Sequence, residues 1–235
     1  MFFARRDAQM ARSGPRGLSS TARTHNYMKI KWFLIILPLL GACSDGQPTS
    51  NEASGPRYQV LAADGTPATG EGLHACVEDL RTGLTWELKS DQPGLHDWRN
   101  TYSWYNPTQA HHELDYRGTQ GGGTCTGSEC DTWALVAAAN EEANCGYNDW
   151  RMPSKDEFFS ISDVRRAKTP PTTDSEFFPL TQSDEYWSAN DYSFQPDSAW
   201  AWNFLYGHDR VDWKKSPKFV RLVRGAAIDL QSVKE

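Results

Sequence analysis

Apart from Cys43, the chain has four cysteines, Cys76, Cys125, Cys130 and Cys145, which fix how it can be cross-linked. An even number of cysteines in an exported chain indicates two disulfides, for which three pairings are possible. Cys125 and Cys130 enclose only Thr-Gly-Ser-Glu, so we pair them with each other, which leaves Cys76 paired with Cys145. The alternative is a four-cysteine zinc site, which the wide spacing around Cys76 and Cys145 disfavours. We therefore expect a doubly cross-linked domain with no metal and no cofactor.

Export is indicated by residues 28–43, which read MKIKWFLIILPLLGAC. Lysines follow Met28, and the apolar run over residues 32–40 is about half as long as a membrane span, as in a secretory signal. The run ends in Leu-Gly-Ala-Cys, which resembles the bacterial lipobox, where small residues precede a cysteine that is acylated. The alternative is a chance cysteine after an ordinary signal peptide. We predict a lipoprotein signal peptide over residues 28–42, with lipidation of Cys43 holding the chain on a membrane.

The segments around this signal are interpreted from their composition. Residues 1–27 are rich in arginine and are interpreted as a mis-assigned extension, with an unusually long leader as the alternative. Residues 43–57 are predicted to be a lipidated flexible tether, followed by a domain over residues 58–228 and a tail over residues 229–235. Ser44 stands where an aspartate usually retains a lipoprotein at the inner membrane. We therefore expect lipid anchoring at the bacterial outer membrane, with the domain facing the periplasm or the surface.

The charge of the mature chain bears on its partners. The full chain has 24 basic and 30 acidic side chains, and residues 1–42 contain seven of the bases and one of the acids. The mature chain therefore carries a net charge of −12. An acidic protein is repelled by phosphate backbones and by sulfated sugars unless its positive charge is segregated. Nucleic acid is therefore not expected as a partner.

The first expected element of the domain is a β-hairpin over residues 76–88. Apolar residues alternate with polar ones along its second half, which predicts a half-buried strand, and Gly83 lies in the turn. Residues 96–123 contain several aromatic residues and end in a glycine run at 121–123, which predicts a long loop. The glycine run lacks the lysine and hydroxyl residue of a phosphate-binding loop.

Two helices are expected in the middle of the domain. The first spans residues 131–144 and is capped by Asp131. The second begins at Ser154, whose sequence Ser-Lys-Asp-Glu forms a capping box, and ends near residue 165. Four residues are expected to share one face of the first helix: Trp133, Val136, Ala137 and Asn140.

Short strands are expected in the last third, at residues 186–188, 199–205 and 219–223. Alternation places Trp200 and Trp202 on the same face of the second strand, which is expected to be the core face. The order of strands, two helices and strands predicts an α+β domain rather than a parallel sheet.

Five segments of this pattern resemble one bacterial family, in the same order: residues 79–87, 125–132, 145–157, 186–188 and 219–224. They are similar to the Lcl C-terminal domain family of secreted and surface proteins. A more distant likeness is to formylglycine-generating enzymes and C-type-lectin-like domains, which share the Arg-hydrophobic-Pro-Ser/Thr-x-x-Glu helix start. The resemblance implies a C-type-lectin-like, formylglycine-generating-enzyme-like domain with two helices and short antiparallel strands. The catalytic cysteines of the enzyme have no evident counterpart here.

Candidate ligand-binding residues are aromatic or basic. Trp98, Trp104 and Trp213 lie in polar sequence and are predicted to be exposed, where they would suit sugar rings or protein partners. A basic stripe near the end of the chain adds Arg210, Lys214, Lys215 and Lys218. The alternatives are structural packing for the tryptophans and a solvated face for the stripe.

The leading hypothesis is an envelope-anchored lipoprotein with a non-catalytic, lectin-like module for glycan or protein ligands. Catalytic residues are not expected, because the sequence shows no serine-protease pattern, no HExxH and no phosphate loop. His111-His112 and the acidic pairs 184–185 and 209/212 are interpreted as surface residues rather than metal ligands. The first alternative is a structural or assembly lipoprotein of the periplasm. The second is an enzyme of the formylglycine-generating type.

Overall fold

A computed structural model describes residues 55–68, 74–109 and 116–228, all within one compact unit. The predicted extension, signal peptide, lipidated Cys43 and tail lie outside the described residues, as do most of the tether and the pair His111-His112. Within the described part of the chain, no helix is long and apolar enough to cross a bilayer.

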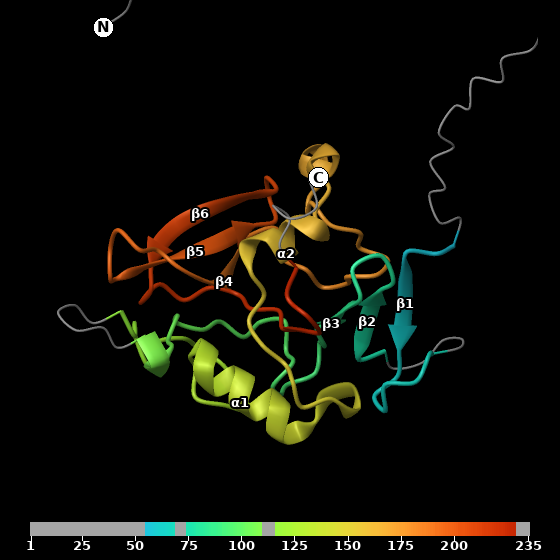
Figure 1. The fold of residues 1–235 in the computed structure, drawn as a ribbon, viewed down its shortest axis with the longest axis horizontal. Helices are drawn as coiled ribbons and strands as arrows, with labels where there is room; N and C mark the ends of the chain where they lie inside the picture. The colour runs from blue at the N-terminus through green and yellow to red at the C-terminus, as the bar shows by residue number, and fades with distance from the viewer. Residues whose placement is uncertain (1–54, 69–73, 110–115, 229–235) are drawn as a thin grey trace, which may run out of the picture. The chain divides into compact units, whose positions relative to one another are not determined.

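In the described residues, seven short strands form two antiparallel sheets, which confirms the α+β class (Figure 1). The first sheet has the order β1-β2-β3-β7 and the second the order β4-β5-β6. The strands are β1 (Tyr58–Leu61), β2 (Cys76–Asp79), β3 (Leu84–Glu87), β4 (Glu185–Asp191), β5 (Ser198–Asn203), β6 (His208–Trp213) and β7 (Val223–Arg224). The last strand returns to pair with β3, so distant parts of the chain close the first sheet.

The predicted hairpin is confirmed, with one correction. Strands β2 and β3 pair antiparallel, and Gly83 has a φ of 71°, a left-handed conformation that glycine adopts without strain. Strand β3 is buried along its whole length rather than half-buried, including Thr85 and Glu87. The reason is that β3 is central in its sheet, with β2 on one side and β7 on the other.

Both predicted helices are present, and both are capped as expected. Helix α1 (Thr132–Glu142) begins where the Asp131 carboxylate accepts a hydrogen bond from the backbone N–H of Ala134. Helix α2 (Lys155–Ser160) has the complete capping box between Ser154 and Glu157. Short 3-10 turns are η1 (Pro107–Gln109), η2 (Asn144–Gly146) and η3 (Val164–Lys168).

Two predictions about the helices are wrong in detail. Helix α2 ends at Ser160 rather than near residue 165, and η3 follows as a separate turn. The buried side of α1 is formed by Thr132, Leu135 and Ala139, whereas Trp133 lies outside it and is 46% exposed. Periodicity alone did not identify the buried face, because small alanines and a threonine face the core here.

The described parts of the predicted long loop, residues 96–109 and 116–123, contain no strand of either sheet but are packed into the domain. Tyr102 pairs with Lys218 and Thr101 with Thr124 through backbone hydrogen bonds. The glycine run at 121–123 packs against the backbone of Thr101 and Tyr102, and a Cβ at Gly123 would lie 2.1 Å from the Thr101 carbonyl oxygen. The run therefore permits a close approach of two backbones, which explains glycine at that position.

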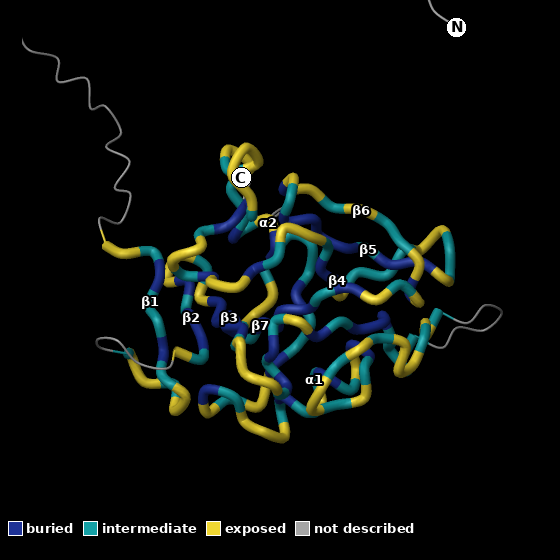
Figure 2. The backbone as a smooth tube through the Cα atoms, turned by 180° about the vertical axis from the view of Figure 1, so that it is seen from behind, coloured by how far each residue is buried: buried dark blue, intermediate teal, exposed yellow. Residues whose placement is uncertain are grey.

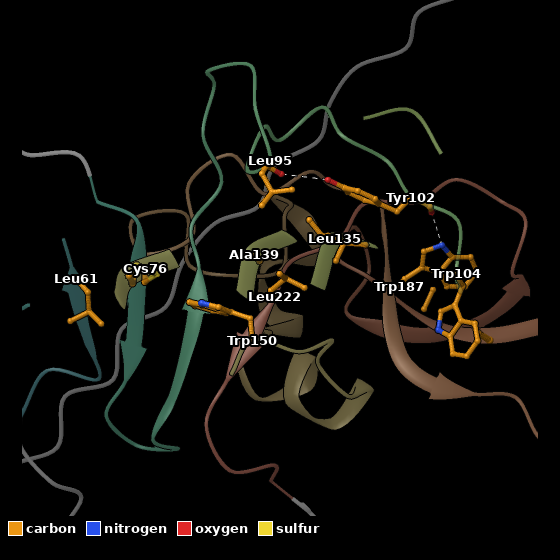
Figure 3. Packing of buried hydrophobic residues seen from close by; sticks show 14 residues of the cluster. Leu61, Cys76, Leu95, Tyr102, Trp104, Leu135, Ala139, Trp150, Trp187 and Leu222 are labelled. Atoms are coloured by element: carbon orange, nitrogen blue, oxygen red, sulfur yellow. Dashed lines mark hydrogen bonds between the residues drawn. A yellow bond between two sulfur atoms is a disulfide. The ribbon is translucent and has the colours of Figure 1, made fainter. Parts of the chain in front are cut away.

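The core contains two clusters that are rich in aromatic side chains. The first includes Tyr102, Trp104, Trp187 and Leu135, and Figure 3 shows the two tryptophans beside Tyr102. The second includes five aromatic residues at its centre: Trp86, Phe158, Phe178, Tyr186 and Phe204. Figure 2 shows that buried segments run through both sheets, whereas the edge strand β6 is largely exposed.

Both predicted disulfides are formed. Cys76 is bonded to Cys145, which joins β2 to the turn after α1, and Cys125 is bonded to Cys130 within one loop. The first bridge lies in the core, because both of its cysteines are buried.

Candidate functional site

The second sheet has one buried face and one partly open face. Ala199 and Ala201 of β5 point into the first core cluster. The register places Trp200 opposite Val211 of β6 and Ser198 opposite Trp213, so these four residues share the other face. Trp202 also lies on that face, but it is covered by Phe159 of α2, whose ring centroid is 6.1 Å away.

Aromatic side chains gather at the open end of this face. The Tyr192 ring lies 5.6 Å from the Trp200 ring and 5.5 Å from the Phe194 ring. Phe194 is 86% exposed and Trp213 is 48% exposed, while Tyr192 and Trp200 are partly buried. We call Tyr192, Phe194, Trp200, Val211 and Trp213 the aromatic face.

Polar groups border the aromatic face at one end. The Lys155 ammonium lies 4.3 Å from the centroid of the Trp200 ring and 2.8 Å from the Asp209 carboxylate. The side-chain oxygen of Asn190 accepts a hydrogen bond from the backbone N–H of Lys155, which fixes the start of α2 against β4. Lys155 and Asp209 therefore lie beside the partly buried ring of Trp200, held by the helix cap and by β6.

A hollow of about 280 Å³ borders the other end. Its polar lining includes the exposed Asp197 and Lys215 and the partly buried Thr119, and Trp213 forms a wall. The Lys215 ammonium lies 5.6 Å from the Trp213 ring. The volume is close to the lower end of small-molecule sites, roughly 300 Å³. An aromatic wall beside a carboxylate, an ammonium and a hydroxyl combines a surface for stacking with groups for hydrogen bonding.

The structure places the three predicted tryptophans differently. Trp213 is exposed, as predicted, and belongs to the aromatic face. Trp104 was expected to be exposed, which is wrong: it is 2% exposed in the core, and its indole N–H donates to the Ser188 carbonyl oxygen at 2.9 Å. Trp98 is partly buried under the Arg99 guanidinium, 4.7 Å from its ring, and lies outside the aromatic face.

The predicted basic stripe does not form a cationic surface. Lys214 is 1% exposed and pairs with Asp191 at 2.6 Å, and Lys218 is buried and pairs with Glu185 and Asp212. Arg210 pairs with Glu185 at 2.8 Å, which leaves Lys215 as the stripe's exposed lysine beside the aromatic face. The expectation failed because acids distant in sequence neutralise these cations.

The ion pair with Lys218 also lowers the pKa of Asp212. Partial burial opposes ionisation of Asp212, but the hydrogen bond and charge of Lys218 outweigh it and lower the pKa of that carboxyl below its usual value. Asp212 therefore stays ionised at neutral pH and keeps Lys218 paired.

The most deeply buried charges stabilise the fold. Glu87 accepts hydrogen bonds from Lys89 and His96, each at 2.7 Å, and from the backbone N–H of Leu222. Burial opposes its ionisation, but Lys89 and His96 outweigh this and lower the pKa of Glu87 to about 2. The Arg221 guanidinium donates to the Glu87 carbonyl oxygen at 2.5 Å. This network binds β3 to the segment before β7.

A second hollow, of about 400 Å³, lies beside α1. Its walls include the apolar side chains of Trp133, Val136 and Met152. Its charged residues, Arg151 and Glu157, form a two-bond ion pair at 2.7 and 2.8 Å. Because Glu157 also completes the cap of α2, this pair serves the fold.

Sequence reasoning missed Tyr192, Phe194 and Asp197, and it assigned Trp200 to the core. A signal was available in the segment 191–197, where two aromatic residues stand among polar ones between two strands. An apolar residue in such a connection has no strand to bury it, and Phe194 is correspondingly the most exposed of the large apolar side chains described.

The model of the Lcl C-terminal domain family matches residues 75–224, and the chain therefore belongs to this family. The matched region contains both helices and every described strand except β1, and it includes the whole aromatic face. Searches of the curated proteins and of the solved structures gave no significant match.

Proposed function

We propose that this member of the Lcl C-terminal domain family is a non-catalytic binding module, anchored to the bacterial outer membrane, that holds an uncharged saccharide on its aromatic face. The observation that carries the proposal is the exposure of Trp213 on β6 and of Phe194 in the β4–β5 connection, beside a sheet whose other face is fixed in the core. Rigid, exposed aromatic side chains give contact area at a low entropic cost, because they lose few rotamers on binding.

The chemistry of the site favours a sugar without charged groups. The C–H face of a pyranose ring packs on an aromatic ring, and its hydroxyls need donors and acceptors at the rim. Asp197, Lys215 and Thr119 supply both kinds of group beside Trp213. Sulfated sugars are disfavoured, because the mature chain has a net charge of −12 and Lys214 and Lys218 are already paired.

We also propose that the domain is a divergent C-type-lectin-like fold. Support comes from the return of β7 to β3, which brings the two ends of the matched region together in one sheet. The capping box at Ser154, preceded by Arg151 and Pro153, adds the helix start that such domains share. This assignment would explain why the ligand site is built on the second sheet and its connections.

Anchoring rests on the sequence of the leader. The lipobox-like Leu-Gly-Ala-Cys supports lipidation of Cys43, and Ser44 supports sorting to the outer membrane. Mass spectrometry of the protein from the membrane fraction tests this part, with an acylated N-terminal Cys43 expected. Unmodified Cys43 in that fraction would refute it.

The absence of catalysis is part of the proposal. Its support is that the buried Glu87 and Arg221 are held by partners in the fold and line neither hollow, and that Glu157, which lines the second hollow, is held in an ion pair with Arg151. A periplasmic assembly role is the second candidate, since an apolar side chain as exposed as Phe194 also suits a protein partner. Stoichiometric co-purification of one partner, without affinity for sugars, would favour that role.

Two tryptophans of similar exposure allow a matched test. The chain from residue 43 onward, carrying Cys43→Ser, is applied to an array of neutral, amino and sulfated oligosaccharides. We expect binding to a neutral sugar that Trp213→Ala weakens by about 2 kcal/mol, or roughly thirtyfold in Kd. Trp133→Ala removes a tryptophan exposed to 46% on α1 and should leave Kd unchanged. Equal effects of the two variants, or binding to sulfated sugars alone, would overturn the proposal.

A further inference from the structure

A larger groove, of about 950 Å³, lies where the described chain begins. Pro56, Arg57 and Tyr58 form one wall, and the segments at 159–166 and 81–82 form much of the rest. Figure 1 shows the start of β1 and the gold turn η3 on the same side of the domain. The tether of residues 43–57 therefore joins the domain at the wall of this groove.

The groove is basic on an otherwise acidic protein. Four arginines and two aspartates line it, which gives a formal net charge of +2, and the exposed Lys168 follows in η3. The arginines are Arg57, Arg81, Arg165 and Arg166, and the aspartates are Asp163 and Asp174. The mature chain as a whole carries −12, so the lining of the groove is opposite in sign to the chain that carries it.

Part of this charge is accessible to a ligand. Arg57 is held by the buried Asp79 and by the Ser160 carbonyl oxygen. Arg165 is 88% exposed, and although it pairs with Asp163 at 2.8 Å, exposed pairs of this kind contribute little. The guanidinium of Arg166 is 3.6 Å from Asp174, a distance beyond a hydrogen bond. Exposed guanidinium groups are well suited to phosphate, which they bind through two parallel bonds.

Exposed apolar side chains accompany these arginines. Phe159 of α2 lines the groove and is more than half exposed. Leu80 and Val164, also more than half exposed, are next in sequence to the lining residues Arg81 and Arg165. Arginines beside exposed aliphatic and aromatic side chains are typical of surfaces that lie at the boundary between lipid head groups and acyl chains.

We infer that this groove is a membrane-facing surface that binds the head groups of anionic phospholipids. The inference rests on the proposed lipid anchor for its location, because a flexible chain as long as the predicted tether, residues 43–57, has an r.m.s. reach of roughly 20 Å and would hold the groove close to lipid. Attraction to the anionic surface then seats the domain on the membrane through Arg165, Arg166 and Lys168. Phe159 and Val164 enter the interface beside them.

The test uses vesicles and a chain that lacks the acyl group. The chain from residue 43 onward, carrying Cys43→Ser, is mixed with vesicles of phosphatidylcholine alone or of equal parts phosphatidylcholine and phosphatidylglycerol. Binding is measured by flotation at low and at high salt. We expect binding to the mixed vesicles alone, weakened by salt. Surface attraction falls by roughly fivefold for each cation removed, so Arg165→Gln/Arg166→Gln should lose at least about tenfold in affinity.

A matched variant controls for net charge. Arg99→Gln/Arg117→Gln also removes two exposed arginines, but neither lines the groove, so affinity should stay within about threefold of the parent. Equal losses in both variants, equal binding to both vesicles, or no binding to either would overturn the inference. Because the assay contains no sugar and no acyl chain, failure of the saccharide site or of Cys43 lipidation would leave its result unchanged.

Discussion

The two disulfides differ in the length of chain that each closes, and this difference predicts their contributions to stability. Cys76 and Cys145 are 69 positions apart, whereas Cys125 and Cys130 are 5 apart. A cross-link stabilises mainly by lowering the entropy of the unfolded chain. The loop-entropy relation gives about 4 kcal/mol for the long loop and about 2 kcal/mol for the short one.

The surroundings of the bridges increase this difference. Cys76 and Cys145 are buried in the first core cluster, so alanine at both positions also removes packing there. Cys125 and Cys130 are only partly buried, so their replacement leaves little unfilled volume. The free energy of unfolding of a domain is typically about 5–15 kcal/mol. Loss of the long bridge alone therefore removes a large part of it.

Urea unfolding followed by tryptophan fluorescence measures both losses. We expect Cys76→Ala/Cys145→Ala to lose at least about 2 kcal/mol more than Cys125→Ala/Cys130→Ala. For Cys76→Ala/Cys145→Ala, the free energy of unfolding should also depend more steeply on urea concentration, because the unfolded chain becomes less compact. Equal losses, or a larger loss from the short bridge, would refute the argument from loop length.

Three further changes test individual contacts. Burial disfavours the charged ring of His96, but the hydrogen bond and charge of Glu87 raise the pKa of His96 above 6.5. The stabilisation from this charged ring is present below pH 6.5 and is lost as the pH rises through the raised pKa. The free energy of unfolding should therefore fall over that pH range in the parent but not in His96→Gln. Gly123→Ala should cost at least about 2 kcal/mol by urea unfolding, because its Cβ meets a backbone carbonyl, whereas Gly55→Ala meets nothing and should be neutral. Ser154→Ala should cost about 1 kcal/mol and lower Tm by about 3 °C in calorimetry.

The features that the sequence predicts well are those with a local cause. The turn at Gly83, the cap at Asp131 and the capping box at Ser154 each depend on residues within a few positions, and each is present. The pairing of Cys125 with Cys130 is also local, and it leaves Cys76 and Cys145 as the second pair. Signals of this range need no knowledge of the rest of the fold.

The predictions that were wrong concern residues whose contacts are distant in sequence. Trp104 stands in polar sequence, yet its backbone N–H donates to Lys214 and its indole to Ser188, which is 84 positions away. Strand β6 begins with three polar residues, His208, Asp209 and Arg210, and was not predicted as a strand; β1 was also missed. Both are edge strands, whose residues are defined by pairing with a neighbour rather than by their own apolar pattern.

The aromatic composition and the failed basic stripe have one physical explanation. Lys214 lies 4.2 Å from the Trp104 ring centroid and Lys218 lies 5.0 Å from that of Trp187. A buried lysine needs an anion, and the electron-rich face of an indole adds to its stabilisation, so a core of tryptophans accommodates cations that an aliphatic core would exclude. Trp104 and Lys214, which both suggested a ligand site, are therefore partners of one another. Trp213 lies at the end of edge strand β6, and its lysine neighbour, Lys215, is exposed rather than buried. The register of β5 with β6, rather than composition, therefore identifies the exposed ring.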